Sequence, residues 1–424
     1  MKKVTLFPFL FILLFTYPLL SQADFFHKIV QNRTDEIFDS LVSIRRDLHQ
    51  HPELSGKEIR TSEIVKNYLT SLGLDVQTNI GGHGVTGILN GSKAGNCVAW
   101  RADMDAFADE SKDNVEFASV NNGIRHICGH DVHTTIGLGL AKILSEQKEK
   151  INGSVMFIFQ PAEENFSGAQ KMKEDGVFNE KKPDLLLALH ITPFPAGVVA
   201  VKSNEMYADR IEFCVKLKKE VDKDLALIEV AKCLEEINKT EVQNIFNVDA
   251  GDQKTGLLSP TGPLNDYLQV QKDKLKAEEQ GEYILINSKA YSSSLSNIEK
   301  AVEKLKDLIN KSDISNSLES VSYIYIQPSV INDPDYVDKS TNIIKSIYGM
   351  QSIFRFYGII PNFNDDFAYF LDNTKGVYFF LGGSDFSKGI ISAPHSPNFK
   401  VDESCIKTGV KYFSSLIYEL LKNE

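Results

Sequence analysis

Apolar segments that end in ionisable residues constrain the fold more than any other feature of this sequence. Residues 154–160 and 184–189 are short apolar runs, typical of strands buried on both faces of a sheet. The first leads into Glu163 and Glu164, and the second is followed by His190. Helical segments separate such runs, which predicts an α/β fold with a mostly parallel sheet. Open α/β sheets bind ligands at the carboxyl ends of their strands, so we expect these side chains to meet in one site.

The middle of the chain differs in character from its two ends. Lysine and glutamate become more frequent, turn residues cluster, and amphipathic helices are predicted from about Asp222 to Ile237 and from about Leu295 to Leu308. A chain of 424 residues is long enough for two domains. We therefore predict a main domain formed by residues 24–205 and 322–424, with helices flanking its sheet. A smaller inserted α+β domain at 206–321 interrupts it.

Helical periodicity marks both ends of the main domain. Residues 35–49 carry apolar side chains at helical spacing, with Thr34 as the predicted N-cap. Residues 402–421 have an apolar face of the same kind. We expect both helices among those that flank the sheet.

The first residues have the order of a secretory signal. Two lysines precede an apolar run over residues 4–20, and small residues ending at Ala23 follow it. A membrane anchor is the competing interpretation, but Pro8 and Pro18 interrupt the run and no charged flank follows it directly. We therefore expect residues 1–23 to be a signal peptide that is removed, and the protein to be periplasmic or secreted.

Charge indicates the class of partner, and cysteine content indicates whether disulfide bonds are expected. The net charge is −11, and basic residues form only short lysine pairs, which argues against nucleic acid and anionic membrane surfaces. A small-molecule or peptide substrate is the remaining expectation. The five cysteines are widely spaced and odd in number, so no disulfide framework is predicted.

Residues 125–133 hold a thiol, three imidazoles and a carboxylate in nine positions. Cys128 and His130 flank a glycine, so both side chains can reach one ion without helical geometry. A buried cysteine beside ordinary histidines is the alternative interpretation of such a pair. Distant segments supply further donors of the right chemistry. A credible set for one or two zinc-like or manganese-like ions comprises Cys128, His130, Glu164, His190 and His395.

The adjacent pair Glu163 and Glu164 can divide two tasks. On an irregular backbone neighbouring side chains point in different directions, so one carboxylate can bind a metal while the other accepts a proton. A carboxylate beside a metal-activated water is the general base that hydrolysis requires. A solvated acidic loop is the alternative, but this pair closes a strongly apolar strand.

Several ordered motifs resemble one family, the amidohydrolases and carboxypeptidases that include hippurate hydrolase, N-acetyl-amino-acid deacetylases and plant auxin-conjugate hydrolases. The motifs lie in both halves of the predicted main domain, which is then the catalytic domain. They comprise residues 45–54, 101–106, 126–133, 159–164, 188–190, 366–368 and 395–399.

The resemblance implies a role for each matching residue. It implies a two-metal site, with Glu163 as the general base, and a lid domain that often mediates dimerisation. Asp105 and Asp131 would orient the metal ligands, with Asp103 a weaker candidate for that role. The ligands that it implies are Cys128, His130, Glu164, His190 and His395.

The lid departs from the family pattern. The family's lid offers a histidine soon after its first strand, and an asparagine and an arginine that hold the substrate. Here no histidine occurs between His190 and His395, and the only arginines in that stretch are Arg210 and Arg355.

Two functions from different classes therefore remain open. The first is metal-dependent hydrolysis of an amide bond in N-acyl amino acids or small peptides, with zinc or manganese as the expected metal and cobalt or nickel as further candidates. The second is a non-catalytic binding protein that keeps the metal pocket but has lost turnover through its lid.

Overall fold

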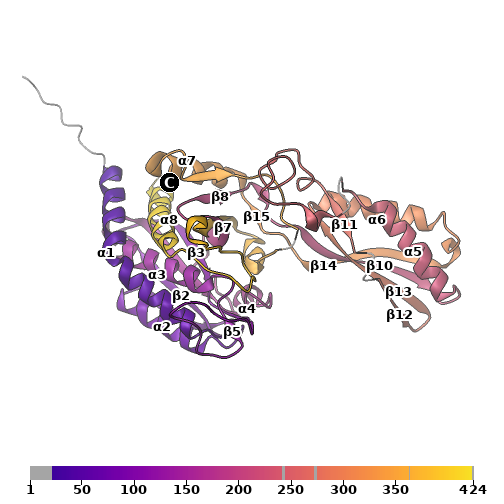
Figure 1. The fold of residues 1–424 in the computed structure, drawn as a ribbon, viewed down its shortest axis with the longest axis horizontal. Helices are drawn as coiled ribbons and strands as arrows, with labels where there is room; N and C mark the ends of the chain where they lie inside the picture. Colours follow the sequence, from indigo (N-terminus) through magenta and orange to yellow (C-terminus); the bar gives the residue numbers. More distant parts are fainter. Residues whose placement is uncertain (1–21, 241–243, 272–274, 362, 423–424) are drawn as a thin grey trace, which may run out of the picture.

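The computed structural model describes residues 22–240, 244–271, 275–361 and 363–422. It forms a large α/β unit and a smaller α+β unit that projects from one side, so the molecule is elongated (Figure 1). The expected fold class, with its inserted smaller domain, is confirmed. The predicted signal peptide lies outside the described residues except for its last two positions, which begin the first helix. Within the described residues, every helix is too short or too polar to span a bilayer.

The large unit is built on a mixed sheet with a parallel centre. In the described part of the chain its strand order is β1-β2-β6-β3-β7-β17-β8-β16. The neighbours β6, β3, β7 and β17 are parallel, whereas β1, β2 and β8 join their neighbours towards the centre antiparallel. The strands are β1 Asp75–Ile80, β2 Gly84–Asn90, β3 Lys93–Asp103, β6 Asn152–Gln160, β7 Leu185–Pro195, β8 Val199–Val201, β16 Ile353–Arg355 and β17 Lys375–Ser384.

Helices cover both faces of this sheet because its strands are apolar on both sides. Trp100 and Phe157 point into the core under the long helices, whereas Ala99 and Ile158 point into the core on the other face. The first core packs against α1 Gln22–Gln50, α2 Ile59–Ser71, α3 His130–Glu146, α7 Pro334–Tyr348 and α8 Ser404–Lys422. The second packs against α4 Gly168–Glu174 and the 3-10 helix η5 Asp366–Leu371.

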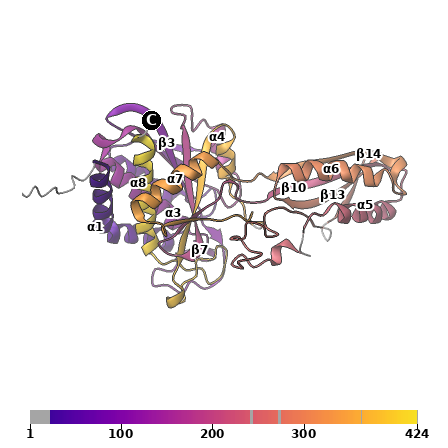
Figure 2. The same cartoon turned by 90° about the horizontal axis from the view of Figure 1, so that it is seen from above.

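The smaller unit is an antiparallel sheet with two helices and its own core (Figure 2). Its strand order is β11-β13-β10-β14, and β12 also pairs with β13. Its elements are β10 Asp209–Lys218, α5 Lys223–Ile237, β11 Leu268–Val270, β12 Lys276–Gln280, β13 Tyr283–Ser292, α6 Leu295–Ile309 and β14 Leu318–Gln327. The remaining short elements are β4 Phe107–Ala108, β5 Ile124–Arg125, β9 Asn204–Glu205, β15 Ile331–Asn332, η1 Lys148–Lys150, η2 Ile245–Asn247, η4 Ser315–Ser317 and η6 Phe386–Lys388.

Two sequence expectations differ from the structure in their boundaries. Strand β14 pairs with β10 as far as Gln327, so residues 322–327 lie in the sheet of the smaller unit rather than in the large unit. Helix α1 begins at Gln22, well before the predicted cap at Thr34. The Thr34 hydroxyl instead donates a hydrogen bond to the carbonyl of Val30 within the helix, at 2.7 Å.

Candidate metal centre

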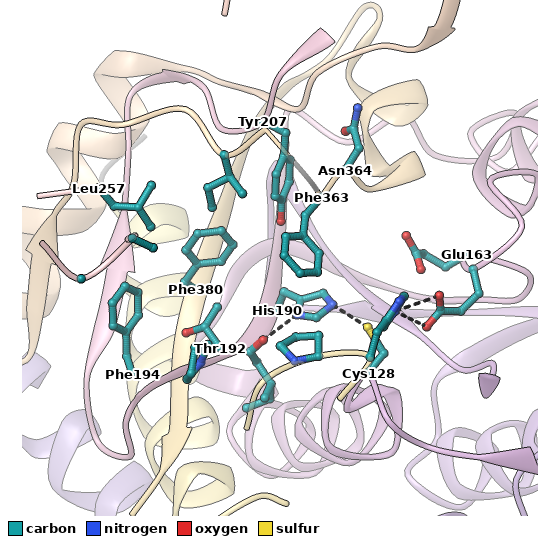
Figure 3. A pocket seen from close by; sticks show the side chains of 18 of the residues that line it. Cys128, Glu163, His190, Thr192, Phe194, Tyr207, Leu257, Phe363, Asn364 and Phe380 are labelled. Carbon is teal, nitrogen blue, oxygen red and sulfur yellow. Dashed lines mark hydrogen bonds and ion pairs between the residues drawn. The ribbon is translucent and has the colours of Figure 1, made fainter. Parts of the chain in front are cut away.

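The five predicted ligands come from four separate segments that meet at the carboxyl end of the parallel sheet. Cys128 and His130 lie on either side of Gly129, which adopts φ +92° and caps α3. A side chain at that glycine would press on Ile191 and Phe399, so the turn requires glycine. His190 comes from β7, Glu164 follows β6, and His395 lies in the loop after β17. Figure 3 shows Cys128, Glu163 and His190 beside a cavity.

The ligand atoms form two groups that share one sulfur. In the described residues, the donor atoms of Cys128, His130 and His190 all lie within 4.8 Å of one another, as do those of Cys128, Glu164 and His395. The Cys128 Sγ is 3.2 Å from His190 Nε2. The Glu164 Oε1 is 3.2 Å from His395 Nε2. The structure therefore brings all five residues together, with Cys128 between two potential ion positions.

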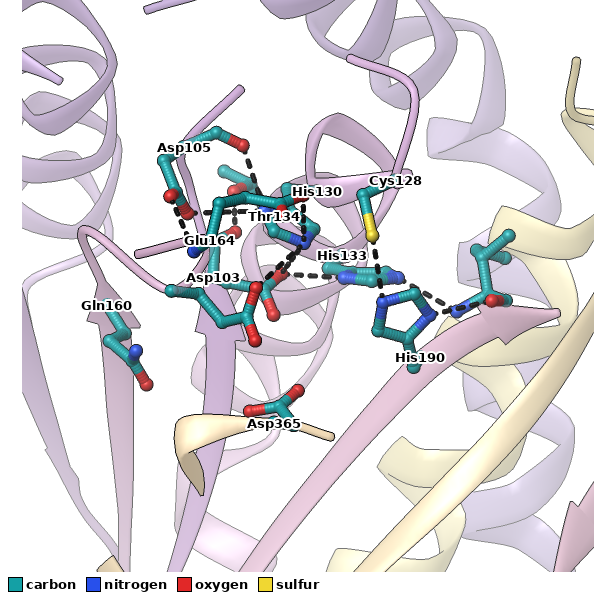
Figure 4. Close-up of polar contacts among 12 residues, drawn as sticks. Asp103, Asp105, Cys128, His130, His133, Thr134, Gln160, Glu164, His190 and Asp365 are labelled. Carbon is teal, nitrogen blue, oxygen red and sulfur yellow. Dashed lines mark hydrogen bonds and ion pairs between the residues drawn. The ribbon is translucent and has the colours of Figure 1, made fainter. Parts of the chain in front are cut away.

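His130 is held in the tautomer that a metal ligand requires. Its Nδ1 lies 2.8 Å from the carbonyl oxygen of Asp105 and donates its proton there (Figure 4). Its Nε2 is buried and has no hydrogen-bond partner among the described residues. That nitrogen is 3.8 Å from carboxylate oxygens of Asp103 and Glu163, too far for hydrogen bonds. A divalent cation fits between such groups, because it would bond the orphaned nitrogen and compensate the carboxylates.

Negative charge dominates the centre and shifts several pKa values. Burial raises the pKa of Glu163 well above its ordinary value, and the nearby Asp365 and Glu164 carboxylates raise it further. Burial alone would lower the pKa of His130, but Asp103 and Asp105 reverse this and raise it to about 10. Burial and the two glutamates also raise the pKa of the Cys128 thiol. Because of these raised pKa values, Glu163, His130 and Cys128 retain protons that a divalent cation would displace on binding.

Two buried carboxylates fix the backbone on either side of Glu163. The Glu58 Oε1 accepts a hydrogen bond from the Ala162 N–H at 2.8 Å, and the Asp105 Oδ2 accepts one from the Glu164 N–H at 3.0 Å. Ala162 has φ +55°, a left-handed conformation that is uncommon for alanine. The turn that directs Glu163 and Glu164 apart is thus held from both ends.

A deep cavity of about 620 Å³ opens beside this centre. Glu163, Glu164, His190 and His395 line one part of it, and aromatic side chains line much of the rest. Its walls contain atoms from both units of the molecule. The lid segment contributes Arg210, Ala250, Gly251, Leu257 and Gln327.

Comparison with known proteins decides the family. A model of the peptidase family M20/M25/M40 matches residues 99–419 of this chain. The chain belongs to that family. It is therefore a hydrolase that acts on C–N bonds.

Relatives of this M20-family hydrolase extend over nearly the whole chain. Thermostable carboxypeptidase 1 of Saccharolobus solfataricus is 31% identical over 396 residues, which cover 90% of this chain and 95% of the relative. The putative amidohydrolase YhaA of Bacillus subtilis is 30% identical over 91% of this chain and 95% of its own. The IAA-amino acid hydrolase ILR1-like 2 of Arabidopsis thaliana is 26% identical over 92% of this chain and 88% of its own.

Solved structures of similar proteins share the fold. Bacillus subtilis YXEP, described as a dinuclear metal binding peptidase from the M20 family, aligns with a TM-score of 0.72 and 24% identity, covering 92% of this chain and all of that one. A putative aminohydrolase from methicillin-resistant Staphylococcus aureus aligns with a TM-score of 0.77 and 23% identity, over 93% of this chain and all of its own. Both alignments cover the α/β unit together with its insertion.

Asp105 and Asp131 were both expected to orient metal ligands, but only Asp105 contacts one in this M20-family chain. Asp105 contacts His130, as expected. Asp131 instead binds Arg45 and His49, at 2.9 and 2.7 Å. It faces those side chains because it lies in the first turn of α3, which packs against α1.

Asp103, the weaker sequence candidate for orienting the ligands, contacts both His133 and Arg101. Its Oδ1 accepts a hydrogen bond from His133 Nδ1 at 2.6 Å, and His133 Nε2 in turn accepts one from the N–H of Ile191. Its other oxygen pairs with the fully buried Arg101 at 2.5 Å. Asp103 therefore links β3 and α3 to β7, next to His190.

Sequence reasoning missed Glu58, Arg101, Asp365 and Asp366. Arg101 joins three carboxylates, because it also pairs with Asp365 at 2.9 Å and Asp366 at 3.2 Å. Burial raises the pKa of Asp366 to about 8, against the effect of Arg101. Arg101 and Asp366 stand inside motifs that the sequence singled out, and a charged residue inside a predicted buried strand is a signal that would have found Arg101. Glu58 gives no such signal.

Proposed function

We propose that this M20-family hydrolase cleaves the amide bond of N-acyl amino acids or small peptides with the help of one or two divalent metal ions. The observation that supports this most directly is the pair of ligand groups that share Cys128, with Glu163 beside them. The relatives named as carboxypeptidase, amidohydrolase and IAA-amino acid hydrolase support the same class of reaction. The proposed metal ligands are Cys128, His130, Glu164, His190 and His395.

Glu163 is the proposed general base. When bound, divalent ions lower the pKa of water and polarise the scissile carbonyl. The Glu163 carboxylate takes the proton from the attacking water and delivers it to the leaving nitrogen. Burial and the neighbouring Asp365 raise the pKa of Glu163, and a bound divalent cation would lower it again, so that the carboxylate is free to accept the proton. Glu58 and Asp105 keep the backbone at Glu163 in place during these steps.

The donor set supports zinc or manganese as the metal. A thiolate and three imidazoles favour zinc, whereas carboxylate and open water positions suit manganese. Cobalt and nickel have related preferences and are further candidates.

The alternative, a non-catalytic binding protein, is disfavoured. Such a protein has no need to retain a buried carboxylate beside the ligand groups, because an unpaired buried acid costs free energy. Glu163 is buried here and faces His130. The lid lacks the family's usual histidine, yet the cavity still receives polar side chains from the lid segment, among them Arg210 and Gln327.

We also propose that the protein is exported and that it forms a homodimer through the lid. The order of residues 1–23 supports a removed signal peptide and a periplasmic or secreted protein. Strand β14 lies at the edge of the lid sheet and exposes Ile324, Tyr325 and Ile326. An exposed apolar edge strand is a surface on which a second copy can add its own strand.

The proposed reaction is tested by turnover with and without Glu163. We expect protein supplied with zinc, manganese or cobalt to release the amino acid from at least one member of a panel of N-acyl amino acids and dipeptides. Glu163→Gln should lower kcat by about 100-fold or more, because the amide cannot take the proton. Metal content measured on the same samples should stay unchanged. Equal rates in the two proteins, or no turnover above the variant, would exclude the proposed reaction.

A further inference from the structure

Residues 245–267 leave the lid between α5 and β11 and pack onto the catalytic unit. The carbonyl of Leu257 accepts hydrogen bonds from the N–H groups of Tyr357 and Gly358, at 2.8 and 3.0 Å. The N–H of Ile359 donates to the carbonyl of Leu264 at 2.7 Å. Leu257 and Leu264 are buried in the same core as the second face of the central sheet. The segment is therefore a fixed wall of the catalytic unit rather than a loose lid loop.

This wall closes the end of the cavity opposite the metal ligands. Figure 3 shows Leu257, Phe194 and Phe380 at one side of the cavity, and Cys128 and Glu163 at the other. The end of the cavity at Leu257 is thus apolar, whereas the other end carries the thiol and the carboxylates.

The rings of Phe380 and Phe194, which line this end of the cavity, each pack against another aromatic ring. The Phe380 ring stacks on Phe356 with ring centroids 5.3 Å apart, and the Phe194 ring meets Phe354 edge-on at 5.2 Å. Both rings therefore have partners behind them that restrict their rotation. The Leu257 backbone is fixed by three hydrogen bonds, because its N–H also donates to the carbonyl of Ala250 at 2.9 Å, so all three walls are preorganised.

We propose that Leu257 forms the floor of an apolar subsite whose length selects the hydrophobic group of the substrate. This inference rests on the proposed function and makes it more specific. The substrates would be amides that carry an aryl or medium-length alkyl group, placed either on the acyl side or as the side chain of the amino acid. A cavity of about 620 Å³ accommodates such a group together with the amide. Each methylene that becomes buried strengthens binding about fourfold, so the floor sets where this gain stops.

The matched pair Leu257 and Leu258 provides the test. Leu257 lines the cavity, whereas its neighbour Leu258 is 41% exposed. Wild type, Leu257→Ala, Leu257→Phe and Leu258→Ala would be assayed on two series of substrates. One series lengthens the acyl chain on a constant amino acid, and the other lengthens the amino-acid side chain under a constant acyl group.

We expect Leu257→Ala to move the preferred length upward by about two methylenes in one series, which corresponds to a change of about 16-fold in the ratio of kcat/KM for long over short substrates. Leu257→Phe should move it downward, and Leu258→Ala should follow wild type. The series that responds identifies which side of the amide occupies the subsite. Identical length profiles in all four proteins would overturn the proposal. Circular dichroism spectra and Leu257→Met, which keeps the volume, control for misfolding.

A binding measurement separates this inference from the proposed reaction. Calorimetric titration of the same two series into Glu163→Gln, with and without Leu257→Ala, requires no turnover. If wild type hydrolyses nothing but the binding profile shifts with Leu257→Ala, the reaction is refuted and the subsite stands. If turnover occurs and neither profile shifts, the subsite is refuted and the reaction stands. Absence of both turnover and binding refutes both.

Discussion

Glu58 is a single buried side chain on which the geometry around Glu163 depends. Its Oε1 accepts hydrogen bonds from the N–H groups of Gly56 and Ala162, both at 2.8 Å. Its Oε2 is buried without a hydrogen-bond partner among the described residues. Burial, and then the charge of Asp105, raise the pKa of Glu58 to about 7. Glu58 thus keeps a proton near neutral pH because it is buried, while its Oε1 accepts hydrogen bonds from the two N–H groups that hold the turn.

Glu58→Gln should change how stability depends on pH. The folded state binds the Glu58 proton more tightly than the unfolded chain, whose pKa is about 4.3. Its stabilising contribution is therefore complete below that value and is lost as pH rises through about 7. Glutamine keeps the accepting oxygen and has no proton to lose, so the variant should gain up to about 3 kcal/mol relative to wild type between about pH 4 and pH 8.

The free energy of unfolding in urea, measured on metal-free protein across this range, checks that expectation. Glu63→Gln is the matched control, because Glu63 lies in the same helix region but is exposed and pairs with Lys66. Parallel pH profiles for wild type and Glu58→Gln would contradict the assigned environment of Glu58.

Short motifs located the five candidate ligands and the supporting Asp105 in the sequence, but they did not indicate Glu58. Cys128 and His130 share one turn, and Glu164 and His190 follow apolar runs, so local patterns are sufficient to locate them. The contact of Glu58 with Ala162 joins residues 104 positions apart. Such a contact leaves no periodic pattern in the sequence, because it depends on how the turn at residues 53–58 packs on the end of β6.

Among the elements, helices with a clear apolar face were predicted closely. The predicted bounds of α5, α6 and α8 differ from the observed ones by no more than two residues at either end. The start of α1 was missed because a threonine at helical spacing resembles a cap until its hydroxyl is seen bonding within the helix. The end of the lid was misplaced because an alternating strand fits either sheet, and only the pairing of β14 with β10 decides.

Capping of α5 provides a test at this scale. The Asp222 carboxylate accepts hydrogen bonds from the N–H groups of Asp224 and Leu225, at 3.0 and 2.9 Å. Asp222→Ala should destabilise the protein by about 1 kcal/mol, because two helix N–H groups lose their acceptor. Asp224→Ala removes a first-turn charge without removing a cap, and should cost less than about half of that. Thermal unfolding of both variants measures the difference, and equal losses would show that Asp222 contributes only its charge.

Across the whole molecule, the candidate centre ties together segments that are distant in the chain. Its donors come from the start of α3 and the residues just before it, from the turn after β6, from β7 and from the loop at His395. That loop is joined to the cysteine segment, because the His395 N–H donates to the carbonyl of Ile127 at 2.9 Å. An ion bound here would bridge both halves of the catalytic unit, so its affinity becomes folding stability.

Metal addition should therefore raise the unfolding temperature. At a free zinc or manganese concentration about 100-fold above Kd, the gain is about 2.7 kcal/mol per site. Cys128→Ser should reduce the gain and the bound metal together, because the sulfur belongs to both donor groups. Cys214→Ser, in the lid strand β10, should behave as wild type. An undiminished gain in Cys128→Ser would show that the thiol binds neither ion.

The position of β17 between β7 and β8 has a consequence for biosynthesis. Strands β7 and β8 leave the ribosome far earlier than β17, and His395 emerges later still. A nascent chain can complete the lid sheet while the main sheet still lacks an inner strand. Catalytic competence is thus delayed until β17 and His395, which follow the whole lid in the chain, have left the ribosome.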